Sequence, residues 1–353
     1  GDTNGNKDIF RWVAGGVDRI SVDGGGNDAN GDSANASMSA GGGLVAFDSA
    51  ATDLLTFGPD TNGFRDIYVR NTSLDENSLV SVNWIGGFAN NSSQNPDISA
   101  DGRYVAFESL ASDLVLLDTN TTTAIYVRDR IGLTTQKVSV NDAGEAANGV
   151  SLSPSISGNG RYVVFWSDAT NLVAGDTNNA RDVFVRDRWT NTTSRLSVDA
   201  YEAQSNGLSQ HPALSENGRY AAFTTAADNL VPNDNNLVNI GPGFFRSAFD
   251  ILVRANPRVT VTSVVPNMLP IGATTSVTIT GTNFLTGATP TISGEDDTLS
   301  NIVIVDENTI TMDVSVDSGA AAGAVNVGVA LYGTGPGLLT GSNAVCAACI
   351  TYF

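Results

Sequence analysis

Lysine is almost missing from this sequence of 353 residues, in which Lys7 and Lys137 are the only two. Together with a net charge of −19, this shortage argues against nucleic acid as a partner, because phosphate contacts need clustered Lys and Arg. The same field disfavours anionic lipid surfaces and favours cations. No stretch approaches the roughly 20 apolar residues that span a bilayer, so we expect no membrane insertion.

A basic n-region followed by an apolar segment is also absent, and the chain starts at Gly1, which is typical of a mature, processed product. Only seven of the 37 acidic residues are Glu, which leaves 37 − 7 = 30 Asp. Asp suits turns and calcium loops more than helix faces. A chain rich in Asp, Asn, Thr, Ser and Gly and poor in Lys favours an extracellular or cell-surface protein, with the periplasm as the alternative.

Histidine and cysteine are scarce too. His211 is the only His, and its surroundings, SQHPALS, contain no nucleophile elbow, so the sequence offers no Ser–His–acid centre. Cys346 and Cys349 stand in CAACITYF, without the His of a haem motif or enough ligands for zinc. Two interpretations remain, a local disulfide or two inert thiols. Residues i and i+3 of a regular strand point to opposite faces, which is geometry that opposes the bond.

A repeat of 58 residues organises the first part of the chain. The tripeptide DTN or its equivalent begins at Asp2, and the spacings 60 − 2, 118 − 60, 176 − 118 and 234 − 176 are all 58. An unbroken period of this size indicates a repeat architecture. Other segments keep the same step: ISADGRYVAF (98–107), ISGNGRYVVF (156–165) and LSENGRYAAF (214–223), with MSAGGGLVAF (38–47) as a looser copy.

Each unit predicts four strands. A short strand meets a DG or NG turn, a strong hairpin signal, and an alternating strand such as RYVAF follows. The DTN loop then leads to DIYVR, and a last strand ends in a segment such as KVSV. No segment has a helical period, so the fold class is all-β, and four-stranded antiparallel units that stack radially form a β-propeller.

The number of blades is less simple. Five DIYVR-like strands begin at residues 8, 66, 124, 182 and 250, but only four RYVAF-like strands occur, so the first blade is incomplete. We expect about five blade positions. Three explanations compete: the first hairpin closes the ring by joining the last unit, or the ring has five positions with one blade incomplete, or an upstream portion was cleaved or belongs to a neighbouring copy.

The motifs SADGRYVAFES and DIYVRDR resemble the PD40 (WD40-like) repeats of TolB-type propellers over residues 1–256. After them, VTVTSVVPNMLPIGATTSVTITGTNF (259–284) lacks the 58-residue echo and resembles the start of an IPT/TIG immunoglobulin-like domain, with CITYF as its last strand. The resemblances imply a propeller over 1–256 and an Ig-like β-sandwich over 257–353, the latter a spacer or interaction module.

The repeated loop presents Asp, Asn and Asp at positions 1, 3 and 7, a hard-oxygen set of the type that Ca²⁺ accepts. The alternative is turn chemistry, since Asp and Asn side chains also satisfy loop backbone groups. In unit three, Ala124 replaces the last Asp, and in unit five Asp250 is displaced. The candidate calcium ligands are Asp2, Asn4, Asp8, Asp60, Asn62, Asp66, Asp176, Asn178 and Asp182.

Unit five carries a ten-residue insertion between Asp234 and Asp250. Its aromatic residues, Phe244, Phe245 and Phe249, either pack the propeller against the next domain or form a contact for a partner or another copy.

No catalytic constellation stands out, so we expect a non-enzymatic interaction or structural protein, with a self-assembling surface or fibre subunit as one version. One alternative is a secreted polysaccharide-active hydrolase or lyase that uses acids in the propeller channel. The other is a periplasmic TolB-like docking protein.

Overall fold

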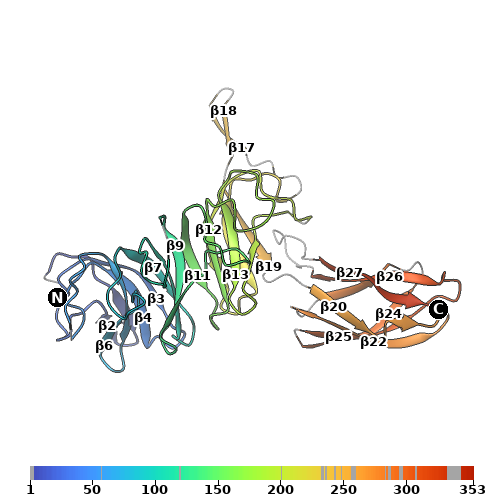
Figure 1. Cartoon of the computed structure of the whole chain (residues 1–353), viewed down its shortest axis with the longest axis horizontal. Helices are drawn as coiled ribbons and strands as arrows, with labels where there is room; N and C mark the ends of the chain where they lie inside the picture. The colour runs from blue at the N-terminus through green and yellow to red at the C-terminus, as the bar shows by residue number, and fades with distance from the viewer. Residues whose placement is uncertain are drawn as a thin grey trace. The chain divides into compact units, whose positions relative to one another are not determined.

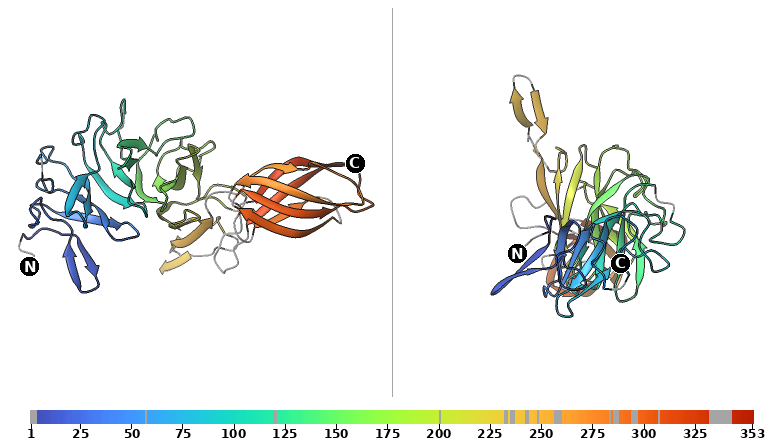
Figure 2. Two further views of the ribbon diagram at one scale, coloured as in Figure 1. Left: turned by 90° about the horizontal axis from the view of Figure 1, so that it is seen from below. Right: turned by 90° about the vertical axis from the view of Figure 1, so that its left-hand side faces the viewer.

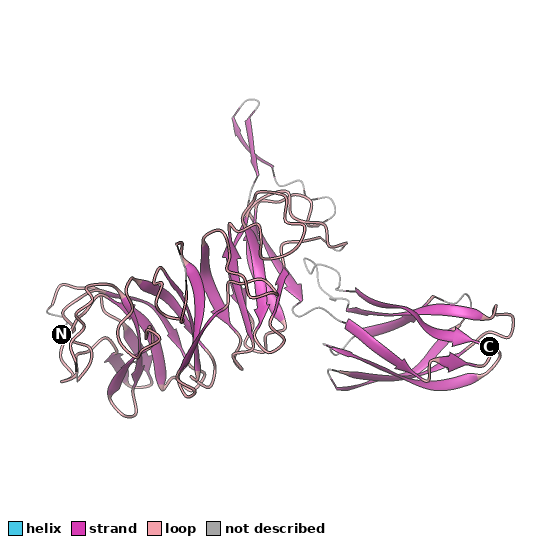
Figure 3. Ribbon diagram, in the orientation of Figure 1, coloured by secondary structure: helices cyan, strands magenta, loops and turns pink. Residues whose placement is uncertain are grey.

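The computed structural model describes residues 4–56, 58–118, 121–199, 201–231, 234, 237–241, 244–247, 249–255, 260–282, 284, 288–293, 297–306, 308–331 and 343–353. The chain divides into two compact units, Gly1–Leu252 and Val253–Phe353. Every regular element in the described residues is a β-strand (Figure 3), which confirms the all-β class. None of these residues belongs to a helix of the length and hydropathy that crossing a bilayer requires.

Three complete blades form the body of the first unit. Each is a four-stranded antiparallel sheet whose strands follow one another in sequence, as the repeat predicts. The blades are β3 (Ser33–Met38), β4 (Leu44–Ser49), β5 (Asp66–Asn71) and β6 (Glu76–Leu79); β7 (Ser93–Ile98), β8 (Tyr104–Ser109), β9 (Ala124–Asp129) and β10 (Thr134–Lys137); and β11 (Ser151–Ile156), β12 (Tyr162–Ser167), β13 (Asp182–Asp187) and β14 (Thr192–Arg195).

Within the first unit the blades lie side by side in sequence order (Figures 1 and 2), and their first strands touch, β3 with β7, β7 with β11 and β11 with β15. Four-stranded meanders stacked in this way define a propeller-type fold. This arrangement confirms the predicted architecture.

Partial blades flank these three. Before them, β1 (Phe10–Val13) and β2 (Gly16–Arg19) form a hairpin that corresponds to the third and fourth strands of a blade. After them, β15 (Ser209–Leu214), β16 (Tyr220–Thr225) and β19 (Asp250–Ala255) form a three-stranded sheet. Among the described residues, β1–β2 and β15–β16–β19 are separate sheets, so the hairpin does not close a ring against the last unit in this structure.

The ten-residue insertion forms a hairpin of its own, β17 (Leu237–Gly241) paired with β18 (Phe244–Ser247). In Figures 1 and 2 this hairpin projects away from the last blade. The backbone of Phe244 and Phe245 lies in β18, whereas their side chains fall outside the described part of the structure. Phe249 is described, and 53% of it is exposed.

The second unit is a sandwich of two sheets around one apolar core. Val277, Ile310 and Met312 of one sheet pack with Leu269 and Val329 of the other in this core. The first sheet contains β20 (Thr260–Val265), β22 (Thr274–Thr282), β25 (Thr309–Ser315) and β24 (Thr298–Asp306); the second contains β21 (Met268–Leu269), β27 (Asn343–Tyr352), β26 (Gly323–Leu331) and β23 (Ala288–Ile292).

Cys346 and Cys349 both lie in β27 and form a disulfide with their Cα atoms 5.6 Å apart. The register between β26 and β27 shifts here, because Val325 pairs with Ile350 but Val327 pairs with Cys346. Two steps along β26 therefore match four along β27. This bulge breaks the strict alternation of side chains and removes the geometric objection to a bond between residues i and i+3.

A tight turn joins the first two strands of each blade, with a glycine at positive φ, such as Gly160 at 71°. The aromatic ring of Tyr104 from the preceding blade lies where a Cβ of Gly160 would stand. Position 160 therefore needs glycine for two reasons: the turn requires a left-handed backbone, and the neighbouring blade leaves no room for a side chain.

We predict that Gly160→Ala destabilises the first unit by about 2–4 kcal/mol, because the new methyl displaces Tyr104 in addition to straining the backbone. The matched control is Gly144→Ala, whose φ is also positive, 83°, but whose Cβ would meet nothing within 4 Å. We expect about 1 kcal/mol there. Urea unfolding measures both, and equal losses would contradict the packing role of Gly160.

Candidate functional site

The repeated DTN loop connects the second and third strands of each blade, and its Asn side chain is the centre of a hydrogen-bond network. In the first complete blade, the Nδ2 of Asn62 donates to Asp66 Oδ2 (2.7 Å) and to the Ala89 carbonyl (3.0 Å). The Oδ1 of Asn62 accepts the Phe64 amide at 2.8 Å. The loop is thereby tied both to the strand that follows it and to the turn beyond the fourth strand.

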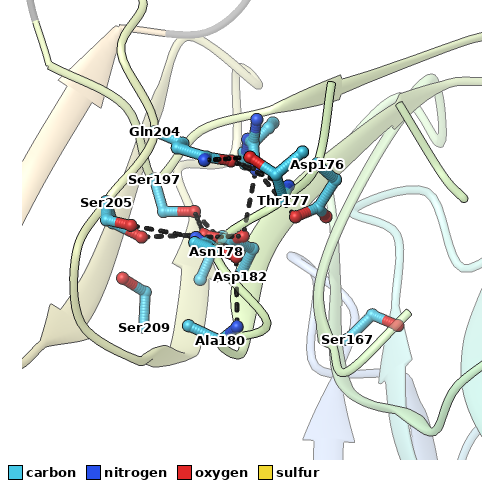
Figure 4. A network of polar contacts seen from close by, with 12 residues as sticks. Ser167, Asp176, Thr177, Asn178, Ala180, Asp182, Ser197, Gln204, Ser205 and Ser209 are labelled. Atoms are coloured by element: carbon cyan, nitrogen blue, oxygen red, sulfur yellow. Dashed lines mark hydrogen bonds and ion pairs between the residues drawn. The ribbon is translucent and has the colours of Figure 1, made fainter. Parts of the chain in front are cut away.

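The third complete blade repeats this network, as Figure 4 shows. Asn178 donates to Asp182 (3.0 Å) and to the Ser205 carbonyl (2.9 Å), and it accepts the Ala180 amide. Ser197 and Ser205 donate their hydroxyls to Asp182 Oδ1. Because the recurrence covers both partners of the Asn, the network belongs to the repeat itself.

The first hairpin has the same arrangement. Asn4 donates to the Ala29 carbonyl at 2.8 Å and to Asp8 at 3.4 Å, and Ser21 donates to Asp8. Asp2 lies outside the described residues, as does Asn120 in unit three. The structure thus brings Asn and the second Asp together in three loops, Asn4 with Asp8, Asn62 with Asp66, and Asn178 with Asp182.

As arranged, these groups do not fit a calcium ion. Calcium needs several oxygens directed at one point. The Asn side chain instead turns its NH₂ group toward the carboxylate, and its oxygen is engaged by a backbone amide two residues later. Within the described part of the chain, no group of three or more His, Cys, Asp or Glu is arranged to hold a metal. Calcium binding stays a prediction, and the hydrogen bonds favour turn chemistry.

Four blades, the first hairpin included, have a fourth strand among the described residues. In three of them a Lys or Arg side chain on that strand lies beside the acids of the loop. Arg19 pairs with Asp28 and lies 3.8 Å from Asp8; Lys137 pairs with Asp118 at 2.6 Å; Arg195 lies 3.1 Å from Asp176 and 3.2 Å from Asp182. These pairs account for much of the negative charge that the sequence places in the loops. Their cations stand at equivalent positions of the repeat, which the loop motif alone does not reveal.

The first complete blade has Leu79 at that position. Asp60 and Asp66 are nevertheless buried, with 6% and 0% exposed, and no Lys or Arg of the described residues forms an ion pair with either. Burial raises the pKa of Asp66 to about 6, and the charge of Asp60 adds to the effect, although hydrogen bonds from Ser81 and Asn62 oppose it. Asp176 and Asp182 of the third complete blade share Arg195, whereas the two acids of this loop have no such cation among the described residues.

A second set of acids, two buried and one partly buried, links neighbouring blades, and no sequence motif identified it. Asp48 accepts the Asn95 amide of the next blade at 3.1 Å, and Glu108 accepts the Ser153 amide of the next at 2.8 Å. Asp97 accepts Ser37 from the blade before it and the Ile156 amide from the blade after it. Asp48 and Glu108 are 0% and 1% exposed, and burial raises the pKa of Glu108.

These acids occupy repeat-equivalent positions, 48 and 108 directly after the Phe of the VAF motif. An acid in an otherwise apolar strand is the signal that could have revealed them. Trp166 takes the same position in the third complete blade, where the Arg181 guanidinium stacks on its ring at 3.8 Å. The acids on this side of the blades thus bind backbone amides.

His211 lies within β15, in the bulge that recurs in the first strand of every blade. Its φ is 50°, as at the equivalent residues Asn35, Asn95 and Ser153, which have φ of 52° to 54°. It is exposed. The backbone conformation of His211 is therefore a feature of the repeat and not of this residue in particular.

No protein-family model matches this chain, and no curated protein is similar to it in sequence. Solved structures that are similar in fold include the following three. A putative TolB from Agrobacterium tumefaciens is 14% identical, over 91% of this chain and 83% of that one, with a TM-score of 0.40. An oligogalacturonate lyase in complex with manganese is 11% identical, over 93% and 68%, with a TM-score of 0.36.

The third is the periplasmic gluconolactonase of Pseudomonas aeruginosa, 12% identical over 89% of this chain and 88% of that one, with a TM-score of 0.29. The propeller-type fold of the present chain rests on its own blades. Likenesses at this level carry no argument about activity, and the IPT/TIG resemblance of the second unit stays a prediction.

We predict that the stability of the protein falls as pH rises from about 4 to about 6, by at most about 3 kcal/mol from Asp66 alone. The pKa of Asp66 is higher in the folded state than in the unfolded state. As pH rises, the unfolded chain therefore loses this proton at a lower pH than the folded chain does, and ionisation stabilises the unfolded state relative to the folded state. Asp66→Asn removes that slope. Urea unfolding at several pH values, with EGTA present, measures it.

Leu79→Arg is the matched variant, because it places a cation where Arg195 stands in the third complete blade. We expect it to flatten the same slope. A wild-type slope that Asp66→Asn leaves unchanged would contradict the assignment. Repeating the wild-type and Asp66→Asn melts in excess calcium tests the metal directly: a rise in Tm lost in the variant would establish calcium at this loop.

Proposed function

We propose that the chain is a non-enzymatic binding scaffold that acts outside the cytoplasm, at the cell surface, in the extracellular space or in the periplasm. One observation carries the proposal. Three acids at the junctions between blades, the buried Asp48 and Glu108 and the partly buried Asp97, accept amides of neighbouring blades. Each therefore has a structural task, and an acid that holds two blades together is poorly placed to exchange protons with a substrate.

Composition supports the location. The chain has a net charge of −19, two lysines and a disulfide in its second unit, and disulfides persist in oxidising compartments. In this proposal the blades form a rigid platform and the second unit is an Ig-like spacer or interaction module of IPT/TIG type. The partner is another protein or another copy of the chain.

The proposal predicts that Glu108→Gln lowers the free energy of unfolding by about 1–3 kcal/mol, because the Ser153 amide loses a charged acceptor in a buried setting. The control is Glu145→Gln at an exposed acid, for which we expect less than about 0.5 kcal/mol. Urea unfolding of the full chain measures both variants.

The competing function, polysaccharide cleavage, is tested on the same proteins with polygalacturonate and a neutral glucan as probes, following reducing ends and the absorbance of unsaturated products. The scaffold proposal predicts no turnover by the wild type. Turnover that Glu108→Gln abolishes while the variant stays folded at the assay temperature would overturn it.

A further inference from the structure

The junction between consecutive blades always uses the same two positions of the third strand. The first position holds an aliphatic residue that faces the next blade. The second holds a ring that faces the previous blade in the three complete blades, and Leu252 in the last blade. Tyr126 packs against Ile67 and Val69 in one core cluster, and Phe184 packs against Ile125 and Val127 in another. Apolar burial at this contact is the main attraction between blades.

The two ends of the stack each keep one half of this contact uncovered. In the complete blades the aliphatic residues Ile67, Ile125 and Val183 are 0% exposed, but their counterpart in the last blade, Ile251 of β19, is 73% exposed. The rings Tyr68, Tyr126 and Phe184 are likewise 0% exposed, but their counterpart in the first hairpin, Phe10 of β1, is 50% exposed.

Neighbouring residues extend both uncovered faces. On the hairpin, Trp12 is 77% and Val17 is 63% exposed. Beside β19, Phe249 is 53% exposed. Terminal units of a repeat stack normally carry a polar outer face, because nothing covers them. These two ends are apolar instead.

We propose that the chain associates head to tail: the hairpin β1–β2 of a second copy stacks on β19 of the first, with Phe10 against Ile251. The contact continues the interface that already joins every pair of blades within the chain. It rests on the proposed function as a scaffold and names the partner, another copy of the same chain. Because the two surfaces differ, each copy keeps one free end after binding, and the assembly grows into a ring or a filament.

Light scattering coupled to size exclusion tests this on the full chain over a range of concentrations. We expect the wild type to exceed the monomer mass as concentration rises. Phe10→Asp and Ile251→Asp each place a charge in the contact and should weaken association at least about tenfold. The control is Ile131→Asp, at a residue that is 74% exposed in a turn of an interior blade, which should leave association unchanged.

Mixing the two variants gives the sharpest result. Ile251→Asp keeps an intact hairpin and Phe10→Asp keeps an intact β19, so the equimolar mixture should form dimers and nothing larger. A symmetric contact through β19 would instead leave Phe10→Asp fully associating, and would overturn the proposal. A wild type that stays monomeric at every concentration, or association that neither variant weakens while both remain folded, would also overturn it.

These outcomes are distinct from those of the proposed function. A chain that is monomeric and has no turnover would overturn the proposed head-to-tail contact but would not contradict the scaffold function. An assembling chain that cleaves polysaccharide would do the reverse.

Discussion

The packing of one blade on the next is the contact on which the first unit depends. A four-stranded sheet whose two faces are both apolar cannot bury both faces by itself. In the third complete blade, every residue of the two central strands, β12 and β13, is buried. Stacking solves this by giving each blade two neighbours. The same contact explains the turn glycines Gly102, Gly160 and Gly218, the ring on the third strand of each complete blade, and the exposed apolar residues where the stack ends.

Polar groups then fix the blades relative to one another. A buried carboxylate that accepts an amide from the next blade is costly to leave unpaired, so it penalises any slippage between sheets. Asp48, Glu108 and the partly buried Asp97 accept amides of the next blade in this way. The Asn–Asp pairs of three described DTN loops, such as Asn62 with Asp66, instead fix the loop within its own blade. Many of the acids that suggest catalysis or metal binding in the sequence are thus engaged in hydrogen bonds that hold loops and blades in place.

Much of the fold could be predicted from the sequence because each strand of the repeat occurs several times. A copy whose pattern is ambiguous can be assigned from the equivalent segments of the other units. The strands around RYVAF and DIYVR lie where the repeat put them. The loops were harder, since Asp and Asn serve metals and turns equally well and only the direction of the Asn62 amide separates the two. The cations Lys137 and Arg195 lie 13 to 19 residues after the acids that they pair with, too far for a local motif to reveal. In the described residues the last blade has three strands, and the chain then enters the second unit, as the end of the 58-residue repeat near residue 256 indicates.

Native-state amide hydrogen exchange tests the central claim, that stability of the first unit comes from blade stacking and declines toward uncovered faces. We expect the slowest exchange in β8, β9, β12 and β13. We expect equally slow exchange of the Asn95 amide in β7 and the Ser153 amide in β11, which donate to buried acids of the preceding blade. It predicts distinctly faster exchange in β16 and β19 at concentrations where the chain is monomeric. Uniform protection across all blades, or a last blade as protected as the third complete one, would contradict it.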